Sequence, residues 1–388
     1  MSELGDRLVV QLIRDYYSAA DIASIAPDRI SEREFGYGVI GNKIANRHMA
    51  FKTPAELKNF LVSNAPAFVD YSAAYYRFPD ARPMEKKIWL GSELRFDLDA
   101  SDAKYDCKIH AKGWLCDERL EAVKRDTLLL IEDFLIGDFG LSEKEIAINF
   151  SGNRGYHIHI TKEAVLQLSQ EAREDLCNYI KPTSIPAKVL FPALAKPMKR
   201  MPQVFPGPKP NEPGWHGKFA LAFIEKLKNV ESLRGLGIDE KLAKRLNKEK
   251  ELVEMGIRQG NWSLVRMPPT EQYWQKVIDS ILFERSVFID ANVTKDPSHL
   301  MRLPNTIHGG SGFIAKKIAS IADLEKFDPM KDAIAWKKGE AKIVANTPYA
   351  LRIGDESYGP FANAEAIVPI YAATYLYLKG FADIKSIY

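Results

Sequence analysis

Two aspartates at the end of an apolar run are the residues of this sequence most directly suited to chemistry. Within residues 89–99, apolar residues at 94, 96 and 98 alternate with Arg95, Asp97 and Asp99. Alternation with a period of two predicts a half-buried strand whose polar face carries both carboxylates. At about 3.3 Å per residue their Cα atoms lie roughly 7 Å apart, so the pair can share one or two divalent cations. The alternative is an ordinary Asp-x-Asp pair in a turn or a surface hydrogen-bond network.

A second stretch, residues 151–160, carries donors that suit a polyphosphate. It reads SGNRGYHIHI and follows a predicted strand at residues 146–150. Its two glycines allow the backbone to approach a ligand closely. Ser151, Arg154 and His157 supply a hydroxyl, a forked cation and an imidazole. The alternative is a hairpin turn whose polar groups hydrogen-bond to one another.

A third stretch, residues 286–312, adds a carboxylate and further anion-binding groups. The apolar run of residues 286–290 predicts a strand that ends in Asp290. Downstream, Arg302 and His308 flank a turn fixed by Pro304, and glycines follow it. A turn of this kind can form a concave surface that binds an anion. With the two earlier stretches it supplies three carboxylates and two sets of phosphate-type donors.

A short loop after the aspartate pair contains three potential metal ligands, Cys107, His110 and Cys116. Two thiolates and an imidazole bind Zn²⁺ well, but a structural site needs a fourth ligand. Arg119 stands where the partner cysteine of a C-x2-C pair is expected, so Asp106 or Asp117 would have to complete the shell. The alternative is a loop with two thiols that bind no metal.

Length and composition describe a globular chain without strong bias. It has 388 residues, of which 46% are hydrophobic and 27% charged, and a net charge of +3. The length favours two units, or one domain with a large insertion, and any basic surface must come from local clustering. Three cysteines favour a reducing compartment over a disulfide framework. We expect no secretory signal at the N-terminus and no membrane span, since the longest apolar passage, residues 367–378, is short and contains Pro369.

Hydrophobic periodicity predicts the elements that position these groups. Leu8, Leu12 and Tyr16 recur at helical spacing, and further helices are expected at residues 55–62 and 118–135. Strands are expected at residues 33–37, 46–51, 70–76 and 146–150. This alternation favours an α/β layer built on a sheet.

The second half of the chain has a different pattern. Residues 163–281 read as a mostly helical insertion, interrupted by prolines between residues 182 and 213. The basic residues Lys196, Lys199 and Arg200 in this loop either contact nucleic acid or keep a solvated connection soluble. Residues 342–388 read as a strand, a Gly-Pro turn at Gly359 and an apolar helix from Ala364 onward, which together form a docking appendage or a cap.

In their order, these motifs resemble those of the catalytic small subunit of archaeal and eukaryotic DNA primase. The matching pieces are FDLD at residues 96–99, SGNRGYH at 151–157 and DANVT…HLMRLPNTIH at 290–308, with a weaker match of REFG at 33–36. The likeness covers residues 31–313 and implies an α/β (α+β) fold, with a primase-type core of mixed sheets flanked by helices. Residues 1–162 and 282–341 would form this core, residues 163–281 the helical insertion and residues 342–388 the C-terminal appendage.

The resemblance also implies roles for individual residues. The catalytic Mg²⁺ or Mn²⁺ ions of the family fall on Asp97, Asp99 and Asp290. Its triphosphate contacts fall on Ser151, Arg154, His157, Arg302 and His308. Asn153 occupies an adjacent motif position, and Glu34 and Arg47 would touch the nucleotide or a metal. A structural zinc beside the active site, here on Cys107, His110 and Cys116, is typical of the family, although Arg119 departs from the usual ligand pattern.

The implied activity is a DNA-directed RNA polymerase of primase type, a nucleotidyltransferase that starts primers from NTPs on single-stranded DNA during replication. The implied partner is a large primase subunit in a heterodimer, and dNTPs are an alternative substrate. Rival readings are a primase-superfamily polymerase that repairs or extends primed ends, a metal-dependent phosphohydrolase and a non-catalytic scaffold. The enzyme would be cytoplasmic and nucleoid-associated in an archaeon, or nuclear in a eukaryote.

Overall fold

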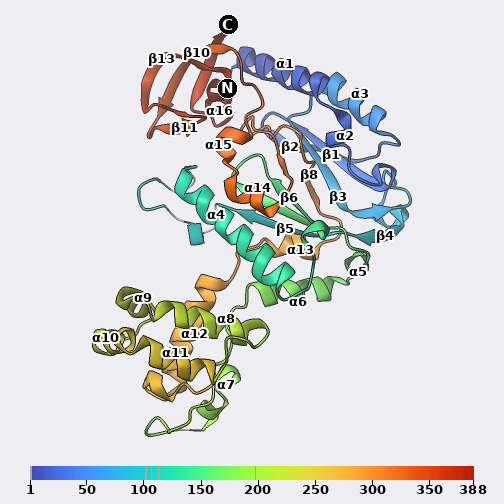
Figure 1. Ribbon diagram of the computed structural model, residues 1–388. Helices are drawn as coiled ribbons and strands as arrows, with labels where there is room; N and C mark the ends of the chain where they lie inside the picture. Colours follow the sequence, from blue (N-terminus) through green and yellow to red (C-terminus); the bar gives the residue numbers. More distant parts are fainter. Residues whose placement is uncertain (1, 101–102, 106, 112–113, 197) are drawn as a thin grey trace. The chain divides into compact units, whose positions relative to one another are not determined.

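The computed structural model describes residues 2–100, 103–105, 107–111, 114–196 and 198–388 (Figure 1). The chain folds into two compact units. The first comprises Met1–Glu132, Leu141–Asp175 and Phe288–Tyr388, and the second comprises Asp133–Gly140 and Leu176–Val287. Helices and several antiparallel sheets are mixed along the chain, which confirms the expected α/β (α+β) fold. In the described part of the chain, no helix combines the length and apolar character needed to cross a bilayer.

The first sheet of unit 1 has the strand order β2-β1-β3-β4, and β8 also pairs with β3. Its strands are β1 (Arg33–Val39), β2 (Asn42–Met49), β3 (Phe68–Tyr76), β4 (Trp89–Ser92) and β8 (Leu300–Arg302). The hairpin between β1 and β2 turns at Gly41, whose φ of 80° suits glycine. The central strand β3 is buried along its whole length. It also pairs with β8, which comes from a much later part of the chain.

The second sheet has the order β5-β7-β6-β9. Its strands are β5 (Leu94–Asp99), β6 (Ile146–Phe150), β7 (Gly155–Ile160) and β9 (Lys317–Ile318). The single strand expected over residues 89–99 is therefore wrong, because the chain leaves the first sheet at Ser92 and enters the second at Leu94. Glu93, between them, is buried, donates its amide to the Ala73 carbonyl and pairs with Arg95. Arg95 is buried as well, so the face opposite the leucines is not a solvent face throughout.

The C-terminal segment forms a third sheet, β13-β10-β14, and a separate two-stranded hairpin, β11-β12. The elements are β10 (Glu340–Thr347), β11 (Leu351–Ile353), β12 (Glu356–Tyr358), β13 (Phe361–Pro369), α16 (Ile370–Leu378) and β14 (Ala382–Ile387). The helix expected from Ala364 onward begins only at Ile370, because residues 361–369 pair with β10 as a strand. Most residues of α16 are buried, as its apolar sequence on all sides requires.

Helices complete unit 1. They are α1 (Glu3–Ala19), α2 (Ile22–Ile25), α3 (Pro54–Asn64), α4 (Asp117–Leu129), α5 (Glu163–Leu166), α6 (Gln170–Ile180, which continues into unit 2), α13 (Ala291–Lys295), α14 (Ile321–Lys326) and α15 (Pro329–Asp332). In α1 the fully buried stripe is Val9, Ile13 and Tyr17, one residue beyond the expected positions 8, 12 and 16. The strand expected at residues 286–290 is wrong. This segment is extended but makes only one backbone hydrogen bond to β5 before α13 begins.

Unit 2 is helical and contains α7 (Ala187–Leu190), α8 (Gly214–Lys226), α9 (Val230–Gly235), α10 (Glu240–Lys248), α11 (Lys250–Arg258) and α12 (Glu271–Arg285). A π-helix over Leu130–Ile136 continues α4 into it. Its core is aromatic. Phe191 stacks on Phe205 at 5.4 Å between ring centroids and contacts Trp274 at 4.2 Å. Both phenylalanines come from the proline-rich segment, which is therefore anchored in a core at these positions and is not a wholly solvated connection.

Candidate active site

A cavity of about 250 Å³ in unit 1 collects most of the residues expected to do chemistry. The expected residues that line it are Asp97, Asp99, Ser151, Asn153, Arg154, His157, Arg302 and His308. Lys43, Asp70 and His299 line it as well. Asp290, Glu34 and Arg47 are not among its lining residues.

The register of the second sheet places the aspartate pair beside residues 151–157, the stretch expected to bind a polyphosphate (the polyphosphate motif). Asp97 pairs with His157, and Asp99 pairs with Gly155. Because alternate residues of a strand point to the same face, both aspartates and His157 share one face of the sheet. The tight turn between β6 and β7 then carries Ser151 and Arg154 to the end of β5. On the first sheet, β8 pairs with β3 and contributes Arg302.

The two carboxylates are accessible and only partly paired. The Asp97 side chain is 29% exposed, and its Oδ1 lies 3.5 Å from His157 Nε2. The Asp99 side chain is 40% exposed and accepts a hydrogen bond of 2.7 Å from Arg154 Nε. Half-exposed carboxylates on one strand face form the oxygen donor set that Mg²⁺ and Mn²⁺ prefer, so these residues fit such ions.

Asp290 reaches the same strand through its backbone. Its amide donates to the Asp97 carbonyl at 2.9 Å, so the chain at this point lies against β5. Its side chain caps α13 by accepting from the Asn292 amide at 2.9 Å. The structure therefore places the backbone of the third aspartate against Asp97, while its carboxylate caps a short helix and does not form a close group of three with Asp97 and Asp99.

Two histidines of the cavity, His157 and His308, are buried and have lowered pKa values. Burial, followed by the nearby His159, lowers the pKa of His157 well below its ordinary value. Burial and then Arg302 do the same for His308. Gly310 donates its amide to His308 Nδ1 at 3.1 Å, which assigns the ring proton to Nε2. His308 thus carries an N–H at Nε2, while His157 Nε2 lies 3.5 Å from Asp97 Oδ1.

Arg302 supplies a permanent charge in a buried position. It is 8% exposed, donates from Nη1 to the Val69 carbonyl at 3.2 Å and lies 3.4 Å from Asp70 Oδ1. Among the described residues, its buried Nε has no hydrogen-bond partner. A buried N–H without a partner is costly, and the permanent charge of Arg302 lines the cavity.

Comparison with known proteins decides the family. The sequence profile described as DNA primase small subunit matches residues 96–319, more than half of the chain. The DNA primase small subunit PriS of Methanosarcina acetivorans is 32% identical, and the alignment covers 95% of this chain and 94% of that protein. PriS of Thermoplasma volcanium is 33% identical, with 96% of both chains covered. The chain belongs to the DNA primase small subunit family. It is thereby a primase-type nucleotidyltransferase that synthesises RNA, and the resemblance of its motifs is confirmed.

Glu34, of the weaker primase match, and Arg47, which was also expected to touch the nucleotide or a metal, lie together in a separate network. Glu34 is completely buried, and its carboxylate lies 3.0 Å from Lys87 Nζ and 3.1 Å from Arg47 Nε. Arg47 also donates to the Ser298 carbonyl at 3.3 Å. These contacts tie β1, β2 and the segment before β8 together.

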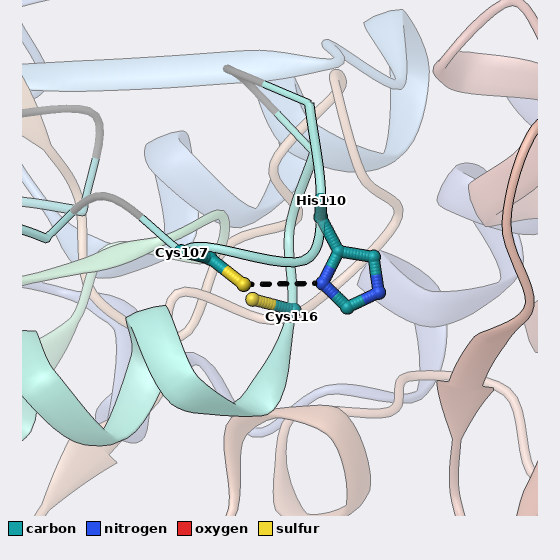
Figure 2. Close-up of side chains that lie close together, drawn as sticks. All are labelled: Cys107, His110 and Cys116. Carbon is teal, nitrogen blue, oxygen red and sulfur yellow. Dashed lines mark hydrogen bonds between the residues drawn. The ribbon is translucent and has the colours of Figure 1, made fainter.

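The Cys-His loop of the primase forms a compact cluster (Figure 2). The ligand atoms of Cys107, His110 and Cys116 all lie within 4.8 Å of one another. Cys107 Sγ lies 3.3 Å from His110 Nδ1 and 2.9 Å from Glu118 Oε2. No other group of three or more His, Cys, Asp or Glu is this close in the part of the chain that the structure describes.

The structure also places the residues proposed to complete this cluster. Asp117 forms two hydrogen bonds of 2.7 and 2.9 Å with Arg352, while Glu118 lies beside Cys107. Asp106 lies outside the described residues. Arg119 is buried and donates to the carbonyls of Ala111 and Trp114, so it holds the loop through its backbone.

Three residues at the primase site were missed by sequence reasoning. Asp70 lines the cavity, and its signal was a carboxylate inside an otherwise apolar strand. Lys43, on β2, lines the cavity too, and Lys379 bonds to Asn153 beside it. Neither lysine belongs to a motif, so nothing in the local sequence marks it.

Proposed function

We propose that this primase subunit carries the catalytic centre and copies single-stranded DNA from NTPs, starting primers without a pre-existing 3′ end. The observation that carries the proposal is the cavity in which two accessible carboxylates on β5 face phosphate-type donors from two other segments. A site for template-directed phosphoryl transfer requires both kinds of group within one cavity.

Asp97 and Asp99 would hold the divalent cations, Mg²⁺ or Mn²⁺, with Asp290 as the third carboxylate. When bound, such cations activate the attacking 3′-hydroxyl and stabilise the pyrophosphate leaving group. Arg154 lies 2.7 Å from Asp99 and lines the same cavity, so its guanidinium stands where it could contact both a cation-binding carboxylate and the triphosphate.

Ser151 and the buried donors would orient the triphosphate. The Ser151 hydroxyl oxygen accepts from the amides of Asn153 and Gly155 at 3.3 and 3.2 Å, so its own proton is available to a phosphate. Arg302 would add a permanent positive charge to the same cavity, and His308 Nε2 a further N–H group. Together they would place positive potential and hydrogen bonds where negative charge develops.

The partners follow from the family and its chemistry. Proteins named small subunit imply a large primase subunit, and we propose that the two form a heterodimer on a single-stranded DNA template. Contacts from lysine and arginine to template phosphates should weaken steeply with salt. The relatives named above are archaeal, which supports a cytoplasmic, nucleoid-associated location. We also propose that Cys107, His110 and Cys116 bind a structural Zn²⁺, with Glu118 as the fourth ligand.

Primer synthesis on an unprimed template tests the proposal. The chain, together with its large subunit, should convert labelled NTPs into dinucleotides and short primers on single-stranded DNA. A repair or extension polymerase would need an added primer, and a phosphohydrolase would release phosphate without elongation. A scaffold would leave the activity of the complex intact after D97A. Any of these three results would overturn the proposal.

A further inference from the structure

The C-terminal segment delivers a lysine to the polyphosphate motif. Lys379 follows the last residue of α16, and its Nζ donates to Asn153 Oδ1 at 2.7 Å. The segment lies beyond residue 319, where the match to the primase profile ends. This contact therefore joins a residue outside the family profile to the turn that carries Ser151 and Arg154.

Lys379 lies at the margin of the active-site cavity. A small cavity of about 40 Å³ is lined by Lys379, Tyr375, Asn153 and Arg154, with other residues of the C-terminal sheet and the Cys-His loop. Asn153 and Arg154 also line the larger cavity that contains the aspartate pair. The two spaces thus share a wall. The lysine ammonium lies 5.2 Å from the centroid of the Tyr375 ring, which helps to hold it in place.

The charge of Lys379 is not balanced by the protein. Within the described residues, no carboxylate lies within ion-pair distance of its Nζ. Burial and then the nearby Arg154 lower its pKa to about 8, while Asp99 acts in the opposite direction. Its positive charge also contributes to the lowered pKa of His308, after burial and Arg302. Lys43, Arg154 and Arg302 line the cavity together with three carboxylates, and Lys379 adds a further cation at its margin.

We propose that Lys379 is a nucleotide-binding residue of this primase, whose ammonium, held by Asn153, contacts the phosphates of the bound NTP. The proposal rests on the function proposed above and adds a residue to its site. A partly buried cation with a neutral amide as its partner gains most from an anionic ligand, because a phosphate oxygen supplies the missing counter-charge. The C-terminal segment is then part of the nucleotide site.

Equilibrium binding separates this role from a purely structural one. The probes are a fluorescent, non-hydrolysable NTP analogue and unlabelled inorganic tripolyphosphate as competitor, with the full chain in its complex. For K379Q we expect the Kd of both to rise about 10- to 100-fold, the value of a charge-assisted hydrogen bond. K379R should restore most of the affinity because it keeps the charge. K342Q is the matched control, since Lys342 lies on β10 and pairs with the exposed Glu365 at 2.9 Å.

The dependence on phosphate number gives the second readout. The loss in K379Q should be largest for the triphosphate, smaller for the diphosphate and slight for the monophosphate, and in primer synthesis it should appear in KM more than in kcat. A uniform loss for all three, or a loss that K379R does not restore, would assign Lys379 a structural role and overturn the proposal. Unchanged affinity in K379Q, with primer synthesis intact, would overturn it while the proposed function stands. A wild-type complex that binds no nucleotide would overturn both.

Discussion

Asp97 of β5 and His157 of β7 are direct cross-strand partners, with His157 Nε2 3.5 Å from Asp97 Oδ1. This pairing places the two aspartates proposed to bind cations beside the turn proposed to bind phosphates. A slip of one residue would turn both aspartates to the opposite face of the sheet, because side chains alternate along a strand. The catalytic proposal therefore depends on the pairing of β5 and β7 as much as on the identity of the residues.

Removing one carboxylate should abolish activity and leave the fold intact. We expect D97N and D99N to lower primer synthesis by more than about 100-fold, because each removes a proposed cation ligand from the site. Both side chains are partly exposed, so their removal leaves no buried charge and the Tm should be unchanged or slightly higher. Primer yield and thermal denaturation of the same preparations measure the two effects. Substantial activity in D97N would contradict the metal-binding role.

Arg302 and Asp70 should be coupled in stability but not in nucleotide binding. Both side chains are 8% exposed, and the pair lies 3.4 Å apart. R302Q leaves Asp70 buried without its cation and should cost about 3 kcal/mol of unfolding free energy. It should also weaken NTP binding about 10-fold or more, because the proposed phosphate contact of Arg302 is lost.

The double variant D70N/R302Q separates these two effects. It should recover much of the stability, since neither charge is left alone, while NTP affinity stays low. Chemical denaturation and equilibrium NTP binding provide the two measurements. Recovery of affinity in the double variant would show that Arg302 acts through Asp70 and does not contact the nucleotide.

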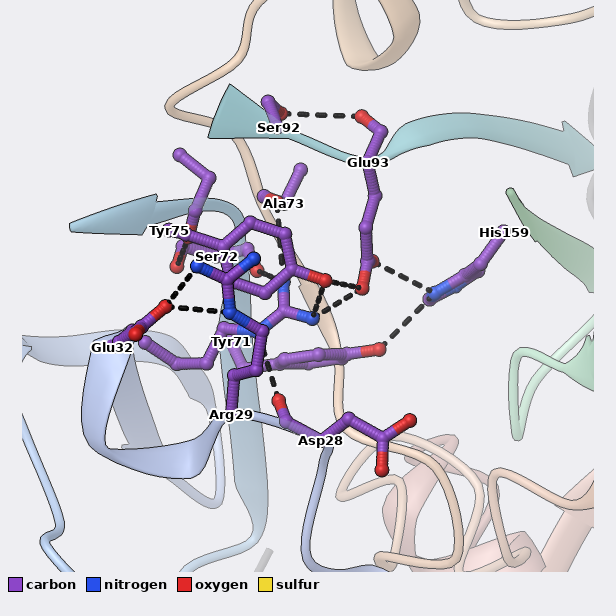
Figure 3. A network of polar contacts seen from close by, with 12 residues as sticks. Asp28, Arg29, Glu32, Tyr71, Ser72, Ala73, Tyr75, Ser92, Glu93 and His159 are labelled. Carbon is purple, nitrogen blue, oxygen red and sulfur yellow. Dashed lines mark hydrogen bonds and ion pairs between the residues drawn. The ribbon is translucent and has the colours of Figure 1, made fainter. Parts of the chain in front are cut away.

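The junction between the first two sheets depends on a buried ion network (Figure 3). Glu93 pairs with Arg33 and Arg95, and Tyr75 donates its hydroxyl to Glu93 at 3.1 Å. Although burial opposes it, Arg95 and Arg33 hold the pKa of Glu93 well below its usual range. E93Q leaves two buried guanidinium groups without their carboxylate, and we expect a loss of about 3–5 kcal/mol in urea denaturation. E85Q, at an exposed position just before β4, is the control, and equal stability of the two variants would contradict the prediction.

His159, in the same network, should make the protein sensitive to mild acid. Burial, followed by the charge of Arg95, lowers its pKa from 6.5 to about 4. A histidine whose pKa is lower in the folded state is protonated first in the unfolded state, so acid favours unfolding. Stability should be complete above about pH 6.5 and fall as the pH decreases toward 4, by up to the order of 3 kcal/mol for this group.

The variant H159Q identifies the share of His159 in this acid response. Its free energy of unfolding should depend less on pH between 6.5 and 4 than that of the wild type. His157 and His308, which are also buried with lowered pKa values, contribute to the remaining slope, as does Glu93 near the acid end. Urea denaturation at a series of pH values measures the slopes. Identical slopes in H159Q and wild type would remove His159 from the explanation.

The sequence predicted the parts of this molecule that are determined locally. The alternation of polar and apolar residues near Asp97 indicates a strand, and the glycines around Arg154 indicate a turn. Both signals lie within a few residues of the sequence. The break at Glu93 was missed because its cause is a pairing with Arg33, far away in sequence. Lys379 reaches the site only through the packing of α16, and residues 361–369 form a strand because β10 pairs with them. Such tertiary effects override local patterns, and a single sequence contains no local record of them.

The Cys-His cluster should bind one zinc ion with Glu118 as its oxygen ligand. Cys107 Sγ already lies 2.9 Å from Glu118 Oε2, whereas both Asp117 oxygens are engaged by Arg352. Metal analysis of the purified chain should therefore give about one zinc per molecule, reduced in C116S and E118Q but not in D117N. Cys107 and Cys116 are half-buried, so a chelator should expose both to a thiol reagent, whereas the buried Cys177 should stay unreactive in the folded protein. The prediction would be contradicted if the purified protein contained no zinc and both thiols reacted at full rate before chelation. The loop would then be held by Arg119 and not by a metal ion.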